Sequence, residues 1–388
     1  MANAVIVDAV RTPMGRGKAG GALSEVHPTD LMAAVLAALV QRNKLDPGSV
    51  EDIVIGCVSQ VGEQSMNPGR LGWLAAGYPE HVPSTTIQRM CGSSQQAVHF
   101  AAQGVMAGAY DIVIAGGVES MSRVPMGSSR VDKDPYGETF KARYLPGLVN
   151  QGVSAEIVAA KWGLGRAEMD AYAARSHQRA AATDFSAEIV PVVTPAGVVA
   201  RDETIRPQTT VESLAGLRAA FENPKDAARF PQVGWGVTAG NSSQITDGAS
   251  AVLIMSEAAA ARLGLRARAR FVAFDVIGDD PLLMLTAPIP ATRRVLAKAG
   301  MQLGQIEHVE VNEAFASVPL AWAKELGGDA DRLNPVGGAI ALGHPLGASG
   351  TRLLTTMLGA MERSGARFGL QTMCEAGGMA NATIIERI

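Results

Sequence analysis

The stretch LDPGSVEDIVIG at residues 45–56 has a counterpart, MQLGQIEHVEVN, at residues 301–312. Both stretches follow an amphipathic segment that predicts a helix. At the same offset of 256 residues (301 − 45), Cys-Gly-Ser-Ser at residues 91–94 falls on Gly-Ala-Ser-Gly at residues 347–350. The apolar runs 111–117 and 367–373 share this offset as well. One constant offset across three elements indicates a duplicated structural unit.

Strand and helix patterns alternate in the first part of the chain. Short apolar runs at residues 4–7, 52–56 and 111–115 predict buried strands, and residues 31–42 and 92–108 predict helices. This alternation predicts an α/β protein with a mainly parallel sheet that helices cover on both faces.

The middle of the chain differs in composition. Residues 118–243 are polar and rich in charge, with a helical segment at 154–182, and an apolar strand pattern returns at 248–255. We therefore expect three parts: an N-terminal half (1–117 plus 244–266), an inserted loop domain (118–243) and a C-terminal half (267–388).

Composition excludes several classes of protein. With 388 residues, of which 47% are hydrophobic and 18% charged, the chain can form a large core in more than one domain. The net charge of −3 argues against general nucleic-acid binding. Three cysteines are typical of a reducing compartment. The chain shows neither an apolar run of membrane-spanning length nor a signal peptide, so we expect a cytoplasmic protein without a membrane span.

Two cysteines stand in patterns that suit chemistry. Cys91 lies at the start of the predicted helix 92–108, where free N–H groups and partial positive charge lower a thiol pKa, so it is a candidate nucleophile. A small buried core residue is the equal alternative from spacing alone. Cys374 follows a short apolar strand, and we expect Cys57 to be an ordinary core thiol.

Two further polar residues have unusual surroundings. His344 lies among glycines that let backbone approach a ligand closely. Asn312 ends a predicted strand, where ligand-binding residues gather in α/β sheets, although a structural pair with Glu313 is the alternative. No histidine shows metal-ligand spacing, so we expect no metal, and we expect His308 at the surface on a strand edge.

These motifs together resemble those of the thiolases, the acetyl-CoA acyltransferases. The matching motifs are Cys-Gly-Ser-Ser at 91–94, Gly-Gly-Val-Glu-Ser-Met-Ser at 116–122, Asn-Glu-Ala-Phe at 312–315, Gly-His-Pro-Leu-Gly-Ala-Ser-Gly at 343–350, and Cys374. The similarity runs in order from the first strand to the last residues. It implies a five-layered αβαβα fold of two duplicated halves with an inserted loop domain, assembled as a homodimer or homotetramer.

The resemblance also implies a role for each site residue. Cys91 would carry the acyl group, His344 would activate it, and Cys374 would be the acid and base at the substrate α-carbon. Asn312 would hold a water that forms one oxyanion hole with His344. The backbone N–H groups of Cys91 and Ala376 would form the other.

Coenzyme A is the cosubstrate that the resemblance implies, with no tightly bound cofactor. A 3-oxoacyl-CoA would be the other substrate, and enzymes of β-oxidation are possible partners. The residues that match the CoA-binding positions of thiolases are Arg206, Ser213, Phe221, Ala239, Ser243 and Phe315.

Two departures from the family pattern bear on function. The second thiol stands in Cys374-Glu-Ala-Gly-Gly, where the family commonly shows Cys-x-Gly-Gly-Gly. Residues 149–152 read Val-Asn-Gln-Gly, where biosynthetic acetoacetyl-CoA thiolases carry a His-Met pair. The lack of that pair favours a degradative enzyme for a medium, long or bulky acyl group.

Three alternatives stay open at this stage. The first is a biosynthetic acetoacetyl-CoA thiolase. The second is a decarboxylating ketoacyl synthase, against which Asn312 and Cys374 argue, because that class uses two histidines beside one cysteine. The third is a non-catalytic CoA- or lipid-binding partner of a β-oxidation complex.

Overall fold

The computed structural model of the protein describes residues 3–388. Its main sheet has ten strands. The strands of the N-terminal half are β1 (Ala4–Arg11), β2 (Gly15–Arg16), β3 (Asp52–Gly56), β4 (Ser84–Ile87), β5 (Ile112–Ser120) and β8 (Thr246–Ser256). Those of the C-terminal half are β9 (Ala269–Gly278), β10 (His308–Val311), β11 (Phe368–Glu375) and β12 (Met379–Arg387). They follow the order β10-β11-β12-β9-β1-β8-β5-β3-β4, with β2 beside β8.

This order contains the same arrangement twice. Reading inward from each side, β3-β5-β8-β1 matches β10-β11-β12-β9, and the two sets meet where β1 pairs with β9. Asp52 and His308, which begin β3 and β10, lie 256 positions apart (308 − 52). Ile112 and Phe368, which begin β5 and β11, show the same offset (368 − 112). The duplication predicted from the sequence is therefore confirmed.

The prediction of a mainly parallel sheet was wrong for the centre of the sheet. β3 runs parallel to β4 and β5, and β10 runs parallel to β11. The pairs β5/β8, β8/β1, β1/β9, β9/β12 and β12/β11 are antiparallel. The connection between β11 and β12 holds only residues 376–378, and such a short turn can join antiparallel strands only. Apolar runs show burial on both faces but not strand direction.

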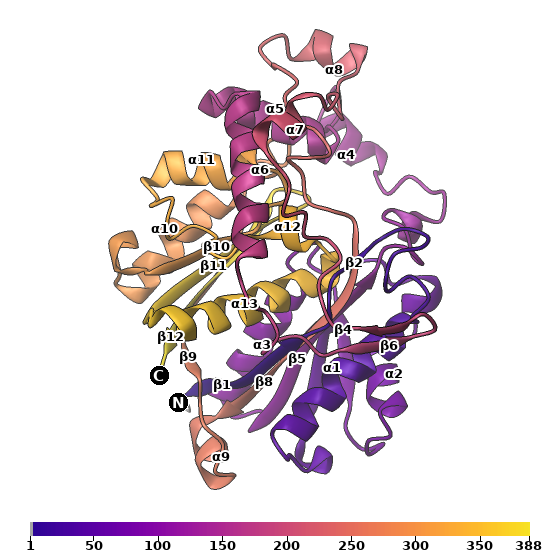
Figure 1. Cartoon of the computed structure of the whole chain (residues 1–388), viewed down its shortest axis with the longest axis vertical. Coiled ribbons are helices and arrows are strands. Elements are labelled where there is room, and N and C mark those ends of the chain that lie inside the picture. The colour runs from indigo at the N-terminus through magenta and orange to yellow at the C-terminus, as the bar shows by residue number, and fades with distance from the viewer. Residues whose placement is uncertain (1–2) are drawn as a thin grey trace.

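Helices form three layers around these strands. The outer helices of the N-terminal half are α1 (Pro28–Arg42) and α2 (Pro68–Ala75), and those of the C-terminal half are α10 (Pro288–Ala299) and α11 (Ser317–Leu326). Between the halves, α3 (Ser93–Ala107) packs against α13 (Ser349–Ser364). Figure 1 shows α13 between the two sets of strands. One hydrophobic cluster joins both central helices to β8 and β12. The predicted five-layered αβαβα fold is confirmed.

The segment between β5 and β8 carries mainly helices. These are α4 (Glu138–Arg143), α5 (Gln151–Trp162), α6 (Arg166–Ala181), α7 (Val211–Ala215) and α8 (Pro224–Arg229), with a hairpin of β6 (Val192–Thr194) and β7 (Gly197–Val199). The single helical segment predicted at 154–182 is two helices, because α5 ends at Gly163 with a φ of 61°. Most of these helices gather at the top of Figure 1. The proposed division into three domains stays a prediction.

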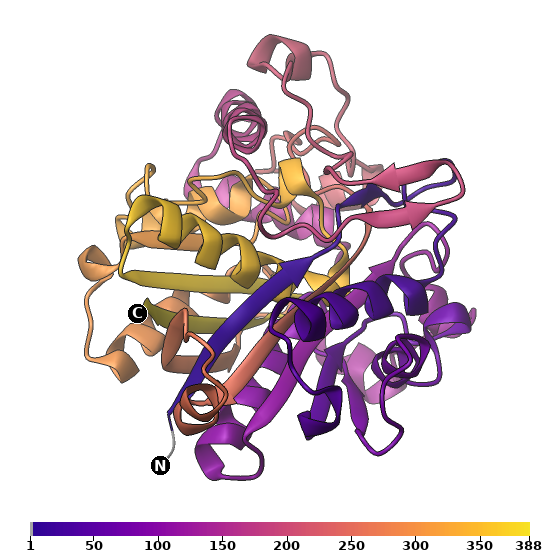
Figure 2. The same cartoon turned by 60° about the horizontal axis from the view of Figure 1, so that its bottom comes forward.

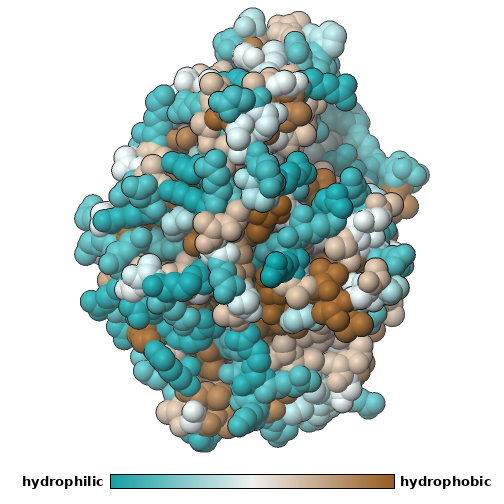
Figure 3. Space-filling view, viewed as in Figure 1, coloured by the Kyte–Doolittle hydropathy of each residue, from teal (hydrophilic) through white to brown (hydrophobic). Residues whose placement is uncertain are grey.

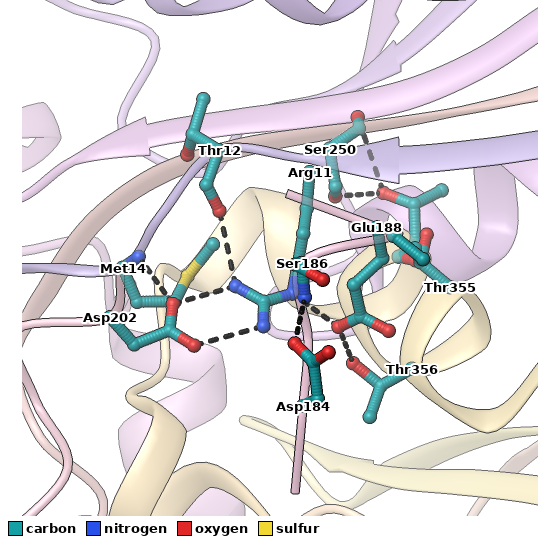
Figure 4. A network of polar contacts seen from close by, with 12 residues as sticks. Arg11, Thr12, Met14, Asp184, Ser186, Glu188, Asp202, Ser250, Thr355 and Thr356 are labelled. Atoms are coloured by element: carbon teal, nitrogen blue, oxygen red, sulfur yellow. Dashed lines mark hydrogen bonds and ion pairs between the residues drawn. The ribbon is translucent and has the colours of Figure 1, made fainter. Parts of the chain in front are cut away.

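A buried arginine anchors this segment to the duplicated core. Arg11 of β1 is fully buried and donates to Glu188 at 2.6 Å and to both oxygens of Asp202 at 2.6 and 2.9 Å (Figure 4). Thr356 of α13 donates to Glu188 at 2.9 Å. The cluster thus ties β1, α13 and the inserted segment together. Figure 2 shows β1 beside β8, the strand to which the chain returns after this segment.

The molecular surface is mainly hydrophilic in the view of Figure 3, with hydrophobic side chains gathered over the N-terminal half. The β6–β7 hairpin exposes Val193 and Val198. Within residues 3–388, every helix is too short or too polar to cross a bilayer.

Candidate active site

Cys91 lies at the N-terminal end of α3, where residues of three motifs meet. Gly92 is the N-cap of the helix. Met90 has a φ of 46°, and residues other than glycine that adopt such positive φ values are often found at functional sites. The Cys91 side chain is buried and packs in one cluster with Met121, Leu353, Leu346 and Met373. Leu346 belongs to the motif around His344, and Met373 precedes Cys374. Tertiary packing therefore brings the first thiol to the other two motifs.

The thiol of Cys91 is protonated in this environment. Burial and the nearby carboxyl of Glu375 raise its pKa to about 12, although the backbone N–H groups of Cys91 and Ala376 favour the thiolate. The sequence predicted a lowered pKa from the helix N-terminus, and that prediction was wrong because desolvation outweighs the helix. A base must therefore remove the proton before Cys91 can act as a nucleophile.

The imidazole of His344, the candidate base, is held in a defined orientation. Its Nδ1 lies 2.6 Å from Oγ of Ser349, and that hydroxyl donates to the carbonyl of Pro345 at 2.8 Å. Since the hydroxyl proton is engaged, Ser349 accepts from Nδ1–H, and Nε2 is left as the acceptor. Burial, assisted by the charge of Arg352, lowers the pKa of His344 to about 3. The imidazole is therefore neutral, and its Nε2 carries no proton.

Asn312 lies beside this imidazole. It directly follows β10, it is buried, and its Nδ2 lies 3.5 Å from Nε2 of His344. Its neighbour Glu313 instead accepts from Tyr172 at 2.9 Å and Ser176 at 2.7 Å. Glu313 therefore has the structural role that the alternative assigned to both residues. Asn312 instead lies beside His344.

Cys374 lies near the end of β11, and Ala376 is the first residue of the turn to β12. Cys374 is fully buried, and burial together with the charge of Cys91 raises its pKa. In the turn, Gly377 and Gly378 adopt φ values of 90° and 77°, whereas Ala376 is not among the residues with positive φ. Alanine thus fits at position 376 without backbone strain, and its N–H points to the Cys91 sulfur, where it favours the thiolate. The departure from the glycine pattern leaves this donor in place.

Three of the predicted CoA-binding residues lie close together. The rings of Phe221 and Phe315 meet edge to face with centroids 5.9 Å apart. The backbone N–H of Ser243 donates to the carbonyl of Ala314 at 2.9 Å, which places the loop of Ser243 against the Phe315 segment.

The other three are more exposed. Ala239 lies exposed on the same loop as Ser243, and the exposed Arg206 donates to Gln244 at 3.1 Å. The hydroxyl of Ser213 donates to the carbonyl of Thr210 at 2.8 Å within the N-terminal cap of α7, so this hydroxyl stabilises the start of the helix.

Sequence reasoning missed or misplaced several residues. Ser349 stands in a quoted motif, yet only its distance to His344 reveals a role. His308 was predicted at the surface and is buried, with Nε2 2.7 Å from a carboxylate oxygen of Glu310. The alternation of β10 places both side chains on one face, a signal that could have found this pair.

Cys57 is buried, as predicted. Within residues 3–388, no three His, Cys, Asp or Glu side chains are grouped as a metal site.

Comparison with known proteins agrees with this geometry. The thiolase N-terminal domain matches residues 4–258 and the thiolase C-terminal domain matches residues 265–387. A steroid 3-ketoacyl-CoA thiolase of Mycobacterium tuberculosis is 47% identical over 100% of this chain and 95% of its own length. A 3-ketoacyl-CoA thiolase of Erwinia tasmaniensis (47%) and a beta-ketoadipyl-CoA thiolase of Acinetobacter baylyi (44%) match over the full length of both chains.

A solved structure supports the same assignment. The acetyl-CoA acetyltransferase of Bacillus anthracis superposes with a TM-score of 0.88 at 34% identity, covering 100% of this chain and 99% of the other. The chain belongs to the thiolase family, and it is an acyltransferase.

Proposed function

We propose that the protein cleaves a 3-oxoacyl-CoA with coenzyme A, giving acetyl-CoA and an acyl-CoA shortened by two carbons. The observations that support this proposal are the packing of Cys91 against Leu346 and Met373, its proximity to Cys374 and to the N–H of Ala376, and the pairing of Asn312 with His344. A buried thiol, a neutral base and two backbone donors are the groups that acyl transfer needs.

The first half of the reaction forms an acyl-enzyme. Nε2 of His344 takes the thiol proton of Cys91, and the sulfur attacks the 3-oxo carbon of the substrate. The tetrahedral intermediate collapses with cleavage of the C2–C3 bond, which leaves the acyl group on Cys91. The departing acetyl-CoA enolate takes a proton at C2 from the thiol of Cys374.

The second half restores the enzyme. The thiolate of Cys374 takes the proton of the CoA thiol, and the CoA sulfur attacks the acyl group on Cys91. As the intermediate collapses, Cys91 leaves and regains its proton from the imidazolium of His344. CoA is therefore a cosubstrate, and every proton moved in the first half returns in the second.

Fixed donors would stabilise the two oxyanions. The backbone N–H groups of Cys91 and Ala376, which favour the Cys91 thiolate at rest, would serve the oxygen of one intermediate. Asn312 and His344 would serve the other through a water. In support, Oδ1 of Asn312 is a buried acceptor without a protein donor among residues 3–388, and a water could donate to it.

The surroundings of Cys91 favour an apolar acyl group. Its packing partners are Met121, Leu346, Leu353 and Met373, and partly buried Val58 lies against them. Such walls suit a hydrocarbon chain or ring better than a short polar group. The name of one relative, a steroid 3-ketoacyl-CoA thiolase, agrees with a bulky substrate.

A thiolysis assay tests the proposal. Purified enzyme is mixed with CoA and a panel of 3-oxoacyl-CoA substrates, from acetoacetyl-CoA to long, branched and cyclic ones, and the products are separated by chromatography. We expect kcat/KM to rise from acetoacetyl-CoA toward the larger members and Cys91→Ala to abolish turnover. A clear preference for acetoacetyl-CoA would favour the biosynthetic alternative. A wild type as inert as Cys91→Ala on every substrate would exclude the proposed reaction.

The assembly and location of the enzyme follow as further proposals. We propose a homodimer or homotetramer that works in the cytoplasm beside other β-oxidation enzymes, and the three free cysteines suit a reducing compartment. Light scattering on the purified protein would decide the number of subunits.

A further inference from the structure

Glu375 places a carboxyl group against the segments that carry both site thiols. It directly follows Cys374 in β11, and its side chain is fully buried. A Cβ atom added to Gly92, the residue after Cys91, would lie 1.8 Å from Oε1 of Glu375. The glycine at position 92 therefore makes room for this carboxyl at the N-terminus of α3.

The surroundings of Glu375 do not suit a carboxylate. Within the described part of the chain, neither carboxyl oxygen accepts a hydrogen bond of normal geometry, although the backbone N–H of Asn381 lies near enough to favour the charged form. Glu119, equally buried, accepts from four donors, which are the backbone N–H groups of Val58, Ser59 and Gly347 and the side chain of Gln64. Because a buried charge without donors is costly, Glu119 suits the ionised form and Glu375 the neutral acid.

A second orphaned acceptor lies beside Glu375. Nδ2 of Asn381 donates to Gln96 at 3.1 Å and lies 3.3 Å from Nδ1 of His99, which orients the amide. Its Oδ1 also has no donor among residues 3–388 and would lie 3.1 Å from a Cβ on Gly92. A protonated Glu375 has the O–H group that this oxygen lacks, so one proton would satisfy both residues.

The charged and titratable groups around Glu375 agree with this assignment. Burial raises the pKa of Glu375 to about 8, and two groups oppose the shift: Arg89, the cation that precedes α3, and the backbone N–H of Asn381. Burial lowers the pKa of His99 to about 3, so that imidazole brings no charge. The remaining neighbours are Cys91 and Cys374, and a charge on Glu375 raises the pKa of both thiols.

We propose that Glu375 holds a proton in the resting enzyme and is a positioning residue that controls the ionisation of Cys91 and Cys374. The part that Glu375 plays in catalysis depends on the proposed thiolase reaction. While Glu375 is neutral, either thiol can lose its proton in turn. Once Glu375 has released its proton to solvent, its charge opposes thiolate formation at both sulfurs.

Alkylation of Cys91 tests this role without any turnover. The variant Glu375→Gln cannot ionise, and its amide N–H can donate to Asn381 as the acid would. The full-length protein is treated with iodoacetamide across a pH series, and mass spectrometry measures modification of the Cys91 peptide. We expect equal rates near pH 6.5 and a rate about fivefold higher for Glu375→Gln near pH 9, because only the wild type then carries the opposing charge. Superimposable profiles would overturn the proposal.

Two controls separate the possible failures. Glu168→Gln, at an exposed position of α6, should follow the wild-type profile. A wild type that alkylates as expected but does not cleave 3-oxoacyl-CoA would refute the proposed reaction and leave the role of Glu375 supported. If Glu375→Gln does not fold, infrared spectroscopy of the wild type decides: a protonated-carboxyl band that disappears as the pH rises through about 8 supports the proposal, and its absence at neutral pH overturns it.

Discussion

Oγ of Ser349 lies 2.6 Å from Nδ1 of His344, and the same hydroxyl donates to the carbonyl of Pro345. This short chain of hydrogen bonds holds the imidazole with Nε2 available as a base. Ser349 begins α13, so the central helix itself orients the imidazole that we propose as the base for Cys91.

We expect Ser349→Ala to lower kcat by roughly tenfold to a hundredfold with little change in KM, because the imidazole loses its orientation but the substrate contacts stay. Steady-state thiolysis kinetics measure the split. Ser349→Thr keeps a hydroxyl and should recover part of the rate. A rise in KM at constant kcat would assign Ser349 to substrate binding instead.

We expect Cys374→Ala to block carbon–carbon cleavage while Cys91 can still be acylated slowly by an acyl-CoA. In the proposed reaction, Cys374 supplies the proton for the enolate, whereas His344 activates Cys91. Intact-protein mass spectrometry should show one acyl group on Cys374→Ala and none on Cys91→Ala. An unacylated Cys374→Ala protein would contradict this division of roles.

Phe221→Ala is expected to raise the KM for CoA about threefold to tenfold with a smaller change in kcat, because the ring pairs edge to face with Phe315 at the expected CoA path. Initial rates at varied CoA concentration give both constants. Phe100→Ala, an exposed phenylalanine on α3, is the matched control and should leave both constants unchanged. An unchanged KM in Phe221→Ala would place the CoA path elsewhere.

Arg11→Met should destabilise the protein by about 3–5 kcal/mol, since it leaves the carboxylates of Asp202 and Glu188 buried without their cation. Chemical denaturation followed by circular dichroism measures the loss. Arg293→Met removes the exposed pair with Glu325 and should cost less than about 1 kcal/mol. Equal losses in the two variants would show that the Arg11 cluster is not a structural anchor.

Glu375 should make the stability of the protein depend on pH. Its pKa is about 8 when folded and close to 4.5 when unfolded, so between these values the folded state binds the extra proton. Its stabilising contribution is complete below about pH 4.5 and declines as the pH rises toward 8. Melting curves of wild type and Glu375→Gln should therefore diverge over this range, with the variant the more stable at the upper end. A constant difference between the two curves would contradict the raised pKa.

Local patterns in the sequence were enough to predict the duplication and the positions of several strands and helices, but not the antiparallel direction of the central strands. Apolar periodicity identified β3 and α3 within a residue or two of their observed bounds, and the constant offset revealed the two halves. Motif resemblance named Cys91, His344, Asn312 and Cys374 as a site whose members the fold brings together. These signals are local, because each depends on residues a few positions apart on one strand or helix.

The protonation states were decided by the tertiary structure alone. The helix N-terminus at Cys91 predicted a lowered thiol pKa, but burial and Glu375, 284 positions later (375 − 91), raise it. Tertiary packing also buries His308 against Glu310, and it leaves the carboxyl of Glu375 buried without a hydrogen bond of normal geometry among the described residues. Chain spacing identifies which side chains are present, whereas their charge depends on desolvation and on neighbours that only the packed halves bring within reach.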